Sequence, residues 1–319
     1  MARLDMARLQ MARLRNAIVL ALALASALIC CAPVVVHGAV PVVVSSKLSS
    51  ESVVIGEMMR LLLEANGIPT IDRMTLAATP IMRRAIIAGE VDLYVEYTGN
   101  AGFFFNVAAD PAWKDLESGY RLGARLDYQA HHIVWLTPAP ASNAWALAVR
   151  DDVAQPNHLE TMTDFSRWVA GGGKLVLACS AEFANSSSLR SLQGTYGFAL
   201  RPDQLIVLAG GDTSATIRAA AERTNGTNTA MVYTTDGAIR EGRLRILADD
   251  RHEEPIYAPV PIIRESVLKA HPQIAGIVKP LMESLTQTRL QQLNERIQMD
   301  GEPPVTVAEN YLKSSGLLK

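Results

Sequence analysis

Residues 89–100 read GEVDLYVEYTGN and contain the clearest strand signal of the chain. Gly89 can end a preceding helix, the run from Val91 to Tyr97 is mostly apolar, and the turn residues TGN follow it. Other strand-like runs, VVVSS at 42–46, KLVLAC at 174–179, QLIVLA at 204–209 and TAMVY at 229–233, alternate with helix-like segments. This alternation predicts an α/β fold in layers.

The chain has 319 residues, which is enough for two domains with their own cores. The turn-rich stretch TPAPASN at 137–143 and the segment at 234–240 are candidate crossings between two lobes. We therefore expect lobe I to comprise residues 39–142 and 238–319, and lobe II residues 143–237. Two crossings make a hinge, and ligands often bind between hinged lobes.

The N-terminus carries a targeting signal. A basic region with four arginines precedes an apolar run at 18–31, and small or apolar residues follow. This pattern predicts a signal peptide at 1–38, cleavage before Ala39 and export to the periplasm. An uncleaved membrane anchor is the alternative, although the run is short for a membrane span. Cys179 would be the only cysteine after cleavage, so no intrachain disulfide is expected.

Composition and motifs argue against several classes of function. A net charge of −2 disfavours nucleic acid as a partner. The stretch AGGGK at 170–174 lacks the spacing of a phosphate-binding loop, and no G-x-S-x-G motif is present. His131 and His132 would point to opposite faces if both lay on a strand. We therefore expect no catalytic residue, no metal and no cofactor.

Four aromatic residues occupy positions where strands are predicted to meet turns, although aromatics make up only 6% of the chain. They are Tyr97 in VEYTG, Trp145 in NAWAL, Tyr233 in VYTTD and Tyr257 in IYAP. Tyr97 and Tyr257 would lie on one lobe, and Trp145 and Tyr233 on or near the other. Ligands of open α/β sheets bind at the carboxyl ends of strands, and converging aromatic faces there would attract a cation.

Several motifs together resemble the osmoprotectant (glycine betaine/choline/carnitine) substrate-binding proteins of ABC importers, especially the YehZ/OsmF-like branch. They are SSKLSSE at 45–51, ATPIMRRAI at 78–86, GEVDLYVEYTGN at 89–100, WLTPAPASNAWALAVR at 135–150, LAGGDTSATIRAA at 208–220, VYTTDG at 232–237 and IYAPVPIIRESVL at 256–268. The resemblance spans nearly all of the chain after the signal. It implies the two-lobe periplasmic-binding-protein fold (type II), with a ligand cleft between the lobes.

The resemblance also implies roles for individual residues. The four aromatics match the family's aromatic box, Lys47 would meet a ligand carboxylate, and Asn100 and Asn143 would hydrogen-bond the ligand. Further candidate ligand contacts are Ser46, Thr98, Glu182 and Asp236. The family's arginine after the Glu-Phe pair is missing behind Glu182-Phe183, and Arg190 comes several residues later. Loss of a bidentate arginine would weaken carboxylate binding, which favours choline-like or larger cations over glycine betaine.

These observations predict a monomeric periplasmic binding protein rather than an enzyme. It would bind a small cationic or zwitterionic solute of the quaternary-ammonium type and deliver it to an ABC permease in the inner membrane. One alternative is a binder of another small zwitterion or amino-acid derivative. A second is a sensory ligand-binding protein that docks a receptor.

Overall fold

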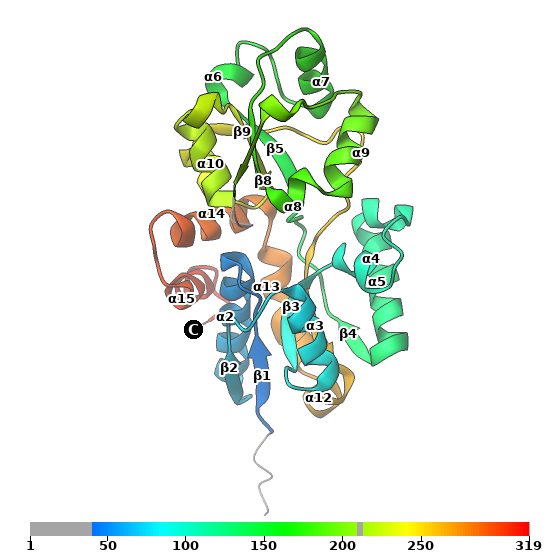
Figure 1. The fold of residues 1–319 in the computed structure, drawn as a ribbon. Helices are drawn as coiled ribbons and strands as arrows, with labels where there is room; N and C mark the ends of the chain where they lie inside the picture. Colours follow the sequence, from blue (N-terminus) through cyan, green and yellow to red (C-terminus); the bar gives the residue numbers. More distant parts are fainter. Residues whose placement is uncertain (1–39, 209–212, 319) are drawn as a thin grey trace, which may run out of the picture. The chain divides into compact units, whose positions relative to one another are not determined.

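The computed structural model describes residues 40–208 and 213–318, and the elements below belong to the unit Pro41–Lys319 (Figure 1). The predicted signal peptide, residues 1–38, lies outside the described residues. Two five-stranded mixed sheets form the framework. The structure therefore confirms the two-lobe α/β fold.

The first sheet has the strand order β2-β1-β3-β10-β4. Its parallel part is β1 with β2 and β3, whereas β10 runs antiparallel to both β3 and β4. The strand bounds are β1 (Val42–Ser45), β2 (Thr70–Arg73), β3 (Leu93–Tyr97), β4 (Ile133–Trp135) and β10 (Pro259–Arg264).

The second sheet repeats this plan with the order β7-β6-β8-β5-β9. Strands β6, β7 and β8 are parallel, and β5 runs antiparallel to β8 and β9. The bounds are β5 (Trp145–Arg150), β6 (Leu177–Ser180), β7 (Leu205–Leu208), β8 (Thr229–Tyr233) and β9 (Leu244–Ile246).

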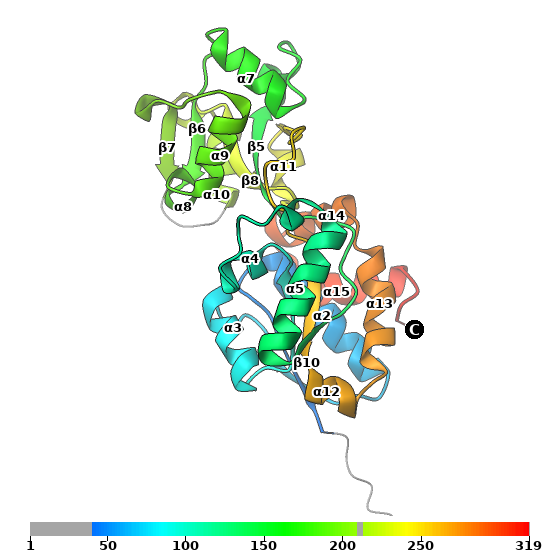
Figure 2. The ribbon, with the colours of Figure 1, turned by 90° about the vertical axis from the view of Figure 1, so that its right-hand side faces the viewer.

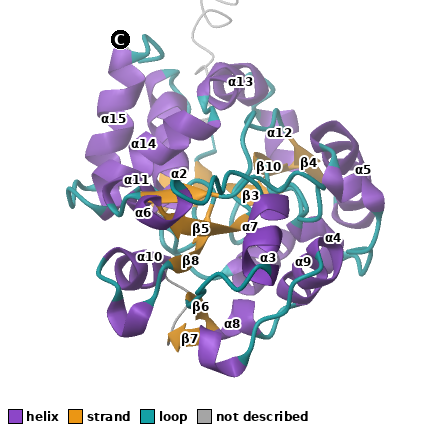
Figure 3. Ribbon diagram, turned by 90° about the horizontal axis from the view of Figure 1, so that it is seen from above, coloured by secondary structure: helices purple, strands orange, loops and turns teal. Residues whose placement is uncertain are grey.

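Helices cover the strands from outside, as the view in Figure 3 shows. Those beside the first sheet are α2 (Ser50–Ala65), α3 (Thr79–Ala88), α4 (Asn100–Phe104), α5 (Leu116–His131), α12 (Glu265–Ala270), α13 (Ile274–Ser284), α14 (Gln287–Gln298) and α15 (Pro304–Ser314). Those beside the second are α6 (Asp151–Ala154), α7 (Met162–Ala170), α8 (Ala181–Ala184), α9 (Ser187–Tyr196), α10 (Thr213–Ala221) and α11 (Ala238–Glu241). Figure 2 shows α9 and α10 next to strands of the second sheet. Short 3₁₀ turns occur at Pro111–Lys114, Pro202–Gln204 and Thr224–Gly226.

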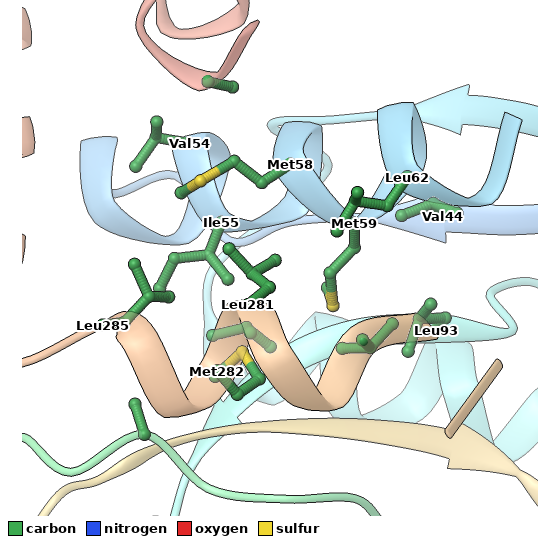
Figure 4. Close-up of a cluster of buried hydrophobic side chains, with 14 of the residues drawn as sticks. Val44, Val54, Ile55, Met58, Met59, Leu62, Leu93, Leu281, Met282 and Leu285 are labelled. Carbon is green, nitrogen blue, oxygen red and sulfur yellow. The ribbon is translucent and has the colours of Figure 1, made fainter. Parts of the chain in front are cut away.

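Each sheet is buried on both faces because alternate side chains of its strands enter different cores. In β3, Leu93 and Val95 join a cluster formed with α2, α13, α14 and α15, whereas Tyr94 packs on the opposite side with α3 and Trp113. Figure 4 shows Ile55 and Met59 of α2 pointing toward Leu281 and Met282 of α13. The second sheet is likewise covered by α7, α8 and α9 on one face and by α10 and α11 on the other. This burial fixes the strand ends at which the candidate site lies.

Two segments connect the sheets, and they run along each other. Backbone N–H groups of the first segment donate to carbonyls of β10 and of the second segment just before it: Leu136 to Pro261 (2.9 Å), Ala139 to Pro259 (2.8 Å) and Asn143 to Tyr257 (2.9 Å). The first segment matches the predicted crossing at 137–143. The second segment differs from the predicted one at 234–240, because α11 and β9 follow that stretch and β9 pairs with β5 in the second sheet. The chain therefore returns to the first sheet between β9 and β10.

A second difference concerns the two histidines. His131 is the last residue of α5 and His132 caps that helix in the left-handed region, with φ of 54°, so neither lies on a strand. No group of metal-ligating side chains occurs in the described ranges. Among those residues, no helix is long and apolar enough to cross a membrane.

Candidate functional site

Because neighbouring strands run antiparallel, the first residue of one strand lies at the same end of the sheet as the last residue of the next. Trp145, the first residue of β5, lies opposite Tyr233, the last residue of β8. In the first sheet, Tyr97 ends β3 opposite Pro259, and Tyr257 lies two residues before the start of β10. The prediction that all four aromatics end strands was therefore wrong for Trp145 and Tyr257. Their positions still fall at the strand edges that carry Tyr233 and Tyr97.

Trp145 and Tyr233 form an aromatic pair. Their ring centroids are 6.4 Å apart with an interplanar angle of 33°. The buried Phe183 meets the Trp145 ring edge-on, with centroids 5.4 Å apart, and so holds the indole in place. Phe183 is part of the Glu-Phe pair at 182–183, but the sequence suggested no role for it. Both Trp145 and Tyr233 remain partly exposed, so their rings offer accessible faces.

The indole Nε1 of Trp145 is buried and makes no hydrogen bond that satisfies distance and angle criteria within the described residues. It nevertheless lies near enough to the Tyr233 hydroxyl to lower the pKa of that group, while burial, the larger effect, raises it. The Nε1–H of Trp145 is therefore a buried donor without a hydrogen-bond acceptor among the described residues. A buried unsatisfied donor costs about 1–3 kcal/mol.

Tyr257 lies on the second connecting segment and covers the turn after β3. A Cβ at Gly99 would come within 2.7 Å of the Tyr257 ring, so the ring rests directly on that glycine. Thr98 fixes the same contact, because its buried hydroxyl donates to Ile256 O (2.7 Å) and accepts from Ala258 N (3.0 Å). Burial raises the pKa of Tyr257, and the charges of Glu254 and Tyr233 raise it further. Tyr257 and Tyr233 are therefore within electrostatic range of each other.

Lys47 and Tyr97 belong to a buried charged cluster. Lys47 forms an ion pair with Glu96, and its ammonium lies 4.9 Å from the centroid of the Tyr97 ring. Glu96 also accepts hydrogen bonds from Asn100 (2.7 Å) and Tyr94 (2.9 Å). Burial lowers the pKa of Lys47, and the Glu96 carboxylate opposes that shift. Lys47 thus has an internal carboxylate partner at the position where the resemblance implies a ligand carboxylate.

Glu51 is a site residue that the sequence reasoning missed. It lies in the first turn of α2 and is 2% exposed. Its Oε1 accepts from the Tyr97 hydroxyl (3.0 Å) and from Asn143 Nδ2 (2.9 Å), and its Oε2 accepts from Asn294 Nδ2 (3.0 Å). Glu51 therefore joins β3, the first connecting segment and α14. The glutamate was visible in the motif SSKLSSE, but there it reads equally well as a favourable charge at a helix start.

The remaining candidates are either buried with hydrogen-bond partners or exposed. Ser46 is fully buried, and its hydroxyl accepts from Thr75 N at 2.8 Å. Asp236 is buried, and its carboxylate accepts from Tyr233 N at 2.7 Å, which fixes the end of β8. Glu182 is exposed and close enough to Tyr233 to raise the pKa of its hydroxyl. Arg190 is exposed and donates to Asn185 O at 2.9 Å, so it serves a local contact.

These contacts connect the candidates in two groups. Lys47, Tyr97 and Asn100 meet around Glu96, and Asn143 joins them through Glu51. Trp145 and Tyr233 form the second group. Tyr257 is related to the first group by its contact with the turn after β3 and to the second by its charge. The thiol of Cys179 is buried, and burial raises its pKa to about 11, which suits a structural residue rather than a nucleophile.

Comparison with known proteins identifies the family of the chain. Residues 40–314 match the family model of the substrate-binding domain of ABC-type glycine betaine transport systems. The glycine betaine-binding protein YehZ of Escherichia coli K12 is 45% identical over 284 residues, which are 89% of this chain and 93% of that protein. A glycine-betaine-binding protein of Pseudomonas aeruginosa is 27% identical over 245 residues, covering 75% of this chain and 76% of its own length.

A solved structure, apo YehZ from Escherichia coli, superimposes with a TM-score of 0.77 at 46% identity. The match covers 87% of this chain and 99% of that one. A match of this extent includes both sheets and both connecting segments. The chain belongs to the family of substrate-binding domains of ABC-type glycine betaine transport systems, which are transport components and not enzymes.

Proposed function

We propose that this binding protein takes up a quaternary-ammonium solute, such as choline, glycine betaine or carnitine, and delivers it to an ABC permease. Tyr97, Trp145, Tyr233 and Tyr257 would form its cage. The observation that carries this proposal is the paired, partly exposed Trp145 and Tyr233 at one strand edge, with ring centroids 6.4 Å apart. A quaternary ammonium offers no N–H group, so aromatic faces and methyl contacts suit it better than hydrogen-bond acceptors.

The expected contributions of the aromatic rings are large enough to bind such a solute. A well-desolvated aromatic face contributes about 2 kcal/mol to cation binding. Several such faces support micromolar affinity, about −8 kcal/mol, after the costs of association. Asn143 donates one amide N–H to Glu51, and its second N–H is a donor that a hydroxyl or carboxylate of the solute would use. A ligand carboxylate would compete with Glu96 for Lys47, and this competition favours choline-like cations over betaines.

Titration calorimetry of the purified protein against choline, glycine betaine, carnitine and proline betaine tests the solute class. We expect micromolar to sub-millimolar binding of at least one, with choline or a larger cation preferred. Acetate and tetramethylammonium are matched controls that carry only the carboxylate or only the cation. A folded protein that binds none of the four solutes at millimolar concentration refutes the proposal.

We also propose that residues 1–38 are a signal peptide and that the protein works in the periplasm. The basic and apolar pattern of 1–38 supports this, as does membership of a family that serves membrane importers. N-terminal sequencing of protein from the periplasmic fraction should begin at Ala39. Protein retained in the membrane with Met1 intact would instead favour an uncleaved anchor.

The lobe limits expected from the sequence were 142/143 and 237/238, with the hinge carried by the connecting segments. We keep the first limit in this proposal. We place the second between β9 and β10, because β9 belongs to the second sheet. Limited proteolysis would test it, since cleavage at the hinge should be suppressed by ligand if closure orders these segments.

A further inference from the structure

Glu254 is a half-buried carboxylate on the connecting segment between β9 and β10, and the proposed cage does not use it. Its Oε2 accepts a hydrogen bond from the hydroxyl of Ser188 (3.1 Å), in the first turn of α9. Its backbone N–H donates to Asp249 Oδ2 (2.8 Å). Main chain and side chain are thus both anchored, and the carboxylate is held at the junction between α9 and the segment that carries Tyr257.

This carboxylate lacks a cationic partner of its own. Among the described residues, no lysine, arginine or histidine forms an ion pair with Glu254, and Lys114, the cation that acts on it, is paired with Glu253 at 3.1 Å. Burial raises the pKa of Glu254 to about 7. The hydrogen bond from Ser188 and the charge of Lys114 oppose this rise, whereas the charges of Asp249 and Glu253 add to it. A positive charge nearby would therefore be stabilising.

The aromatic residues lie within reach of this charge. The pKa of Tyr257 is raised first by burial, then by the charge of Glu254, and then by Tyr233. Glu254 also lies three residues before Tyr257 on the same connecting segment, and its partner Ser188 lies five residues after Phe183, whose ring meets Trp145. A cation bound against the Tyr257 and Tyr233 rings would be in the field of an uncompensated carboxylate.

We propose that Glu254 sets the charge preference of the solute site, favouring a solute with a net positive charge over a net-neutral zwitterion. The proposal rests on the proposed function, because it assumes that the solute binds at the aromatic residues. Glu254 acts through its field while it remains bonded to Ser188, and it is a specificity residue rather than a direct ligand contact. The negative charge of Glu254 acts in the opposite sense to the positive charge of the family's arginine, which is missing behind Glu182-Phe183.

The consequence is a proton linkage. A bound cation favours the ionised carboxylate and lowers its pKa, so cation binding releases protons near neutral pH. If the bound cation lowers the pKa of Glu254 from about 7 by about one unit, affinity rises about fivefold between pH 6 and pH 8. A zwitterion carries a compensating carboxylate, so its affinity should change less over the same range.

Calorimetry with choline and with glycine betaine at pH 6, 7 and 8 tests this, in buffers of different ionisation enthalpy that report the protons released. We expect about fivefold tighter choline binding at pH 8 than at pH 6, with proton release. Glu254→Gln keeps the acceptor for Ser188 and removes the charge. It should flatten the choline profile and narrow the preference for choline over glycine betaine.

Two variants serve as controls. Glu253→Gln removes the neighbouring charge and should keep the pH dependence, with its midpoint moved slightly lower. His252→Asn changes the histidine of the same segment and should also keep the pH dependence. Choline binding that is independent of pH, or that keeps its pH dependence in Glu254→Gln, overturns the inference alone. A failure of every solute to bind at any pH overturns it together with the proposed function.

Discussion

Replacement of Glu51 by glutamine tests whether one buried carboxylate holds the site together. Glu51 accepts hydrogen bonds from Tyr97, Asn143 and Asn294 at 2.9–3.0 Å. In Glu51→Gln the amide oxygen can keep Tyr97 and Asn143, but the new NH₂ group then faces the NH₂ group of Asn294. Asn294 could turn its unpartnered Oδ1 toward the glutamine, but it would lose the bond that its Nδ2 donates to Thr235 O.

The cost follows from these contacts. A hydrogen bond to a charged group contributes about 1.5–3 kcal/mol, and a neutral one about 0.5–1.5 kcal/mol. The variant loses one charged bond and converts two into neutral ones, while relief of the buried charge offsets part of this loss. We expect the free energy of unfolding to fall by about 2–4 kcal/mol. Choline affinity should also fall, because Tyr97 and Asn143 lose their common anchor.

Urea denaturation followed by circular dichroism at pH 7 measures this change. Glu57→Gln is the matched control, since Glu57 is also buried on α2 and bonds Arg60 on the same helix. The control should change the free energy of unfolding by less than about 1 kcal/mol, as expected for a pair that is partly open to solvent. If Glu51→Gln is no more destabilising than Glu57→Gln, the role given to Glu51 is wrong.

Four further substitutions probe the site. Trp145→Ala and Tyr233→Ala should each cost about 1–3 kcal/mol of solute affinity in calorimetry with little loss of fold, and unchanged affinity in both would place the cage elsewhere. Gly99→Ala should push the Tyr257 ring from its place, since the new Cβ would meet it at 2.7 Å, and solute affinity should drop about tenfold while the thermal midpoint barely moves. Glu254→Gln should raise the free energy of unfolding by up to about 3 kcal/mol at pH 8 but not at pH 4. A carboxyl whose pKa is raised in the folded state makes the protein less stable as the pH climbs from about 4.5 to about 7, and the glutamine removes this loss. Equal urea midpoints of variant and wild type at pH 8 would contradict this.

Local signals predicted much of the first sheet and its helices. The strand predicted at 91–97 from its apolar run and the turn residues after it corresponds to β3 (Leu93–Tyr97). Helix α5 was not predicted. Its buried positions are Gly119, Gly123 and Asp127, which show no large apolar residue at helical spacing. The apolar surface is supplied instead by tryptophans from elsewhere, Trp113 against Gly119 and Trp135 against Gly123.

The features of the site that could not be predicted depend on contacts between residues far apart in the sequence. The turn after Tyr233 resembles a crossing, and only the pairing of β9 with β5 shows that the chain stays with the second sheet. Lys47 and Glu96 are 49 residues apart, and no local pattern pairs them. The aromatic positions were proposed from predicted strand–turn boundaries and then from motif resemblance, which carries long-range information that periodicity lacks. Glu51 and Glu254 were missed because glutamates are common at helix starts and in loops.

The central claim is that a positive charge, and not only apolar shape, is recognised by the aromatic residues. Calorimetry of choline against 3,3-dimethylbutan-1-ol tests this most directly, because the alcohol replaces the ammonium nitrogen by carbon and keeps the methyl groups and the hydroxyl. A cation–π contribution of about 2 kcal/mol predicts that choline binds about 30-fold more tightly. Equal affinities for the two compounds would contradict the cation cage and leave an apolar pocket in its place.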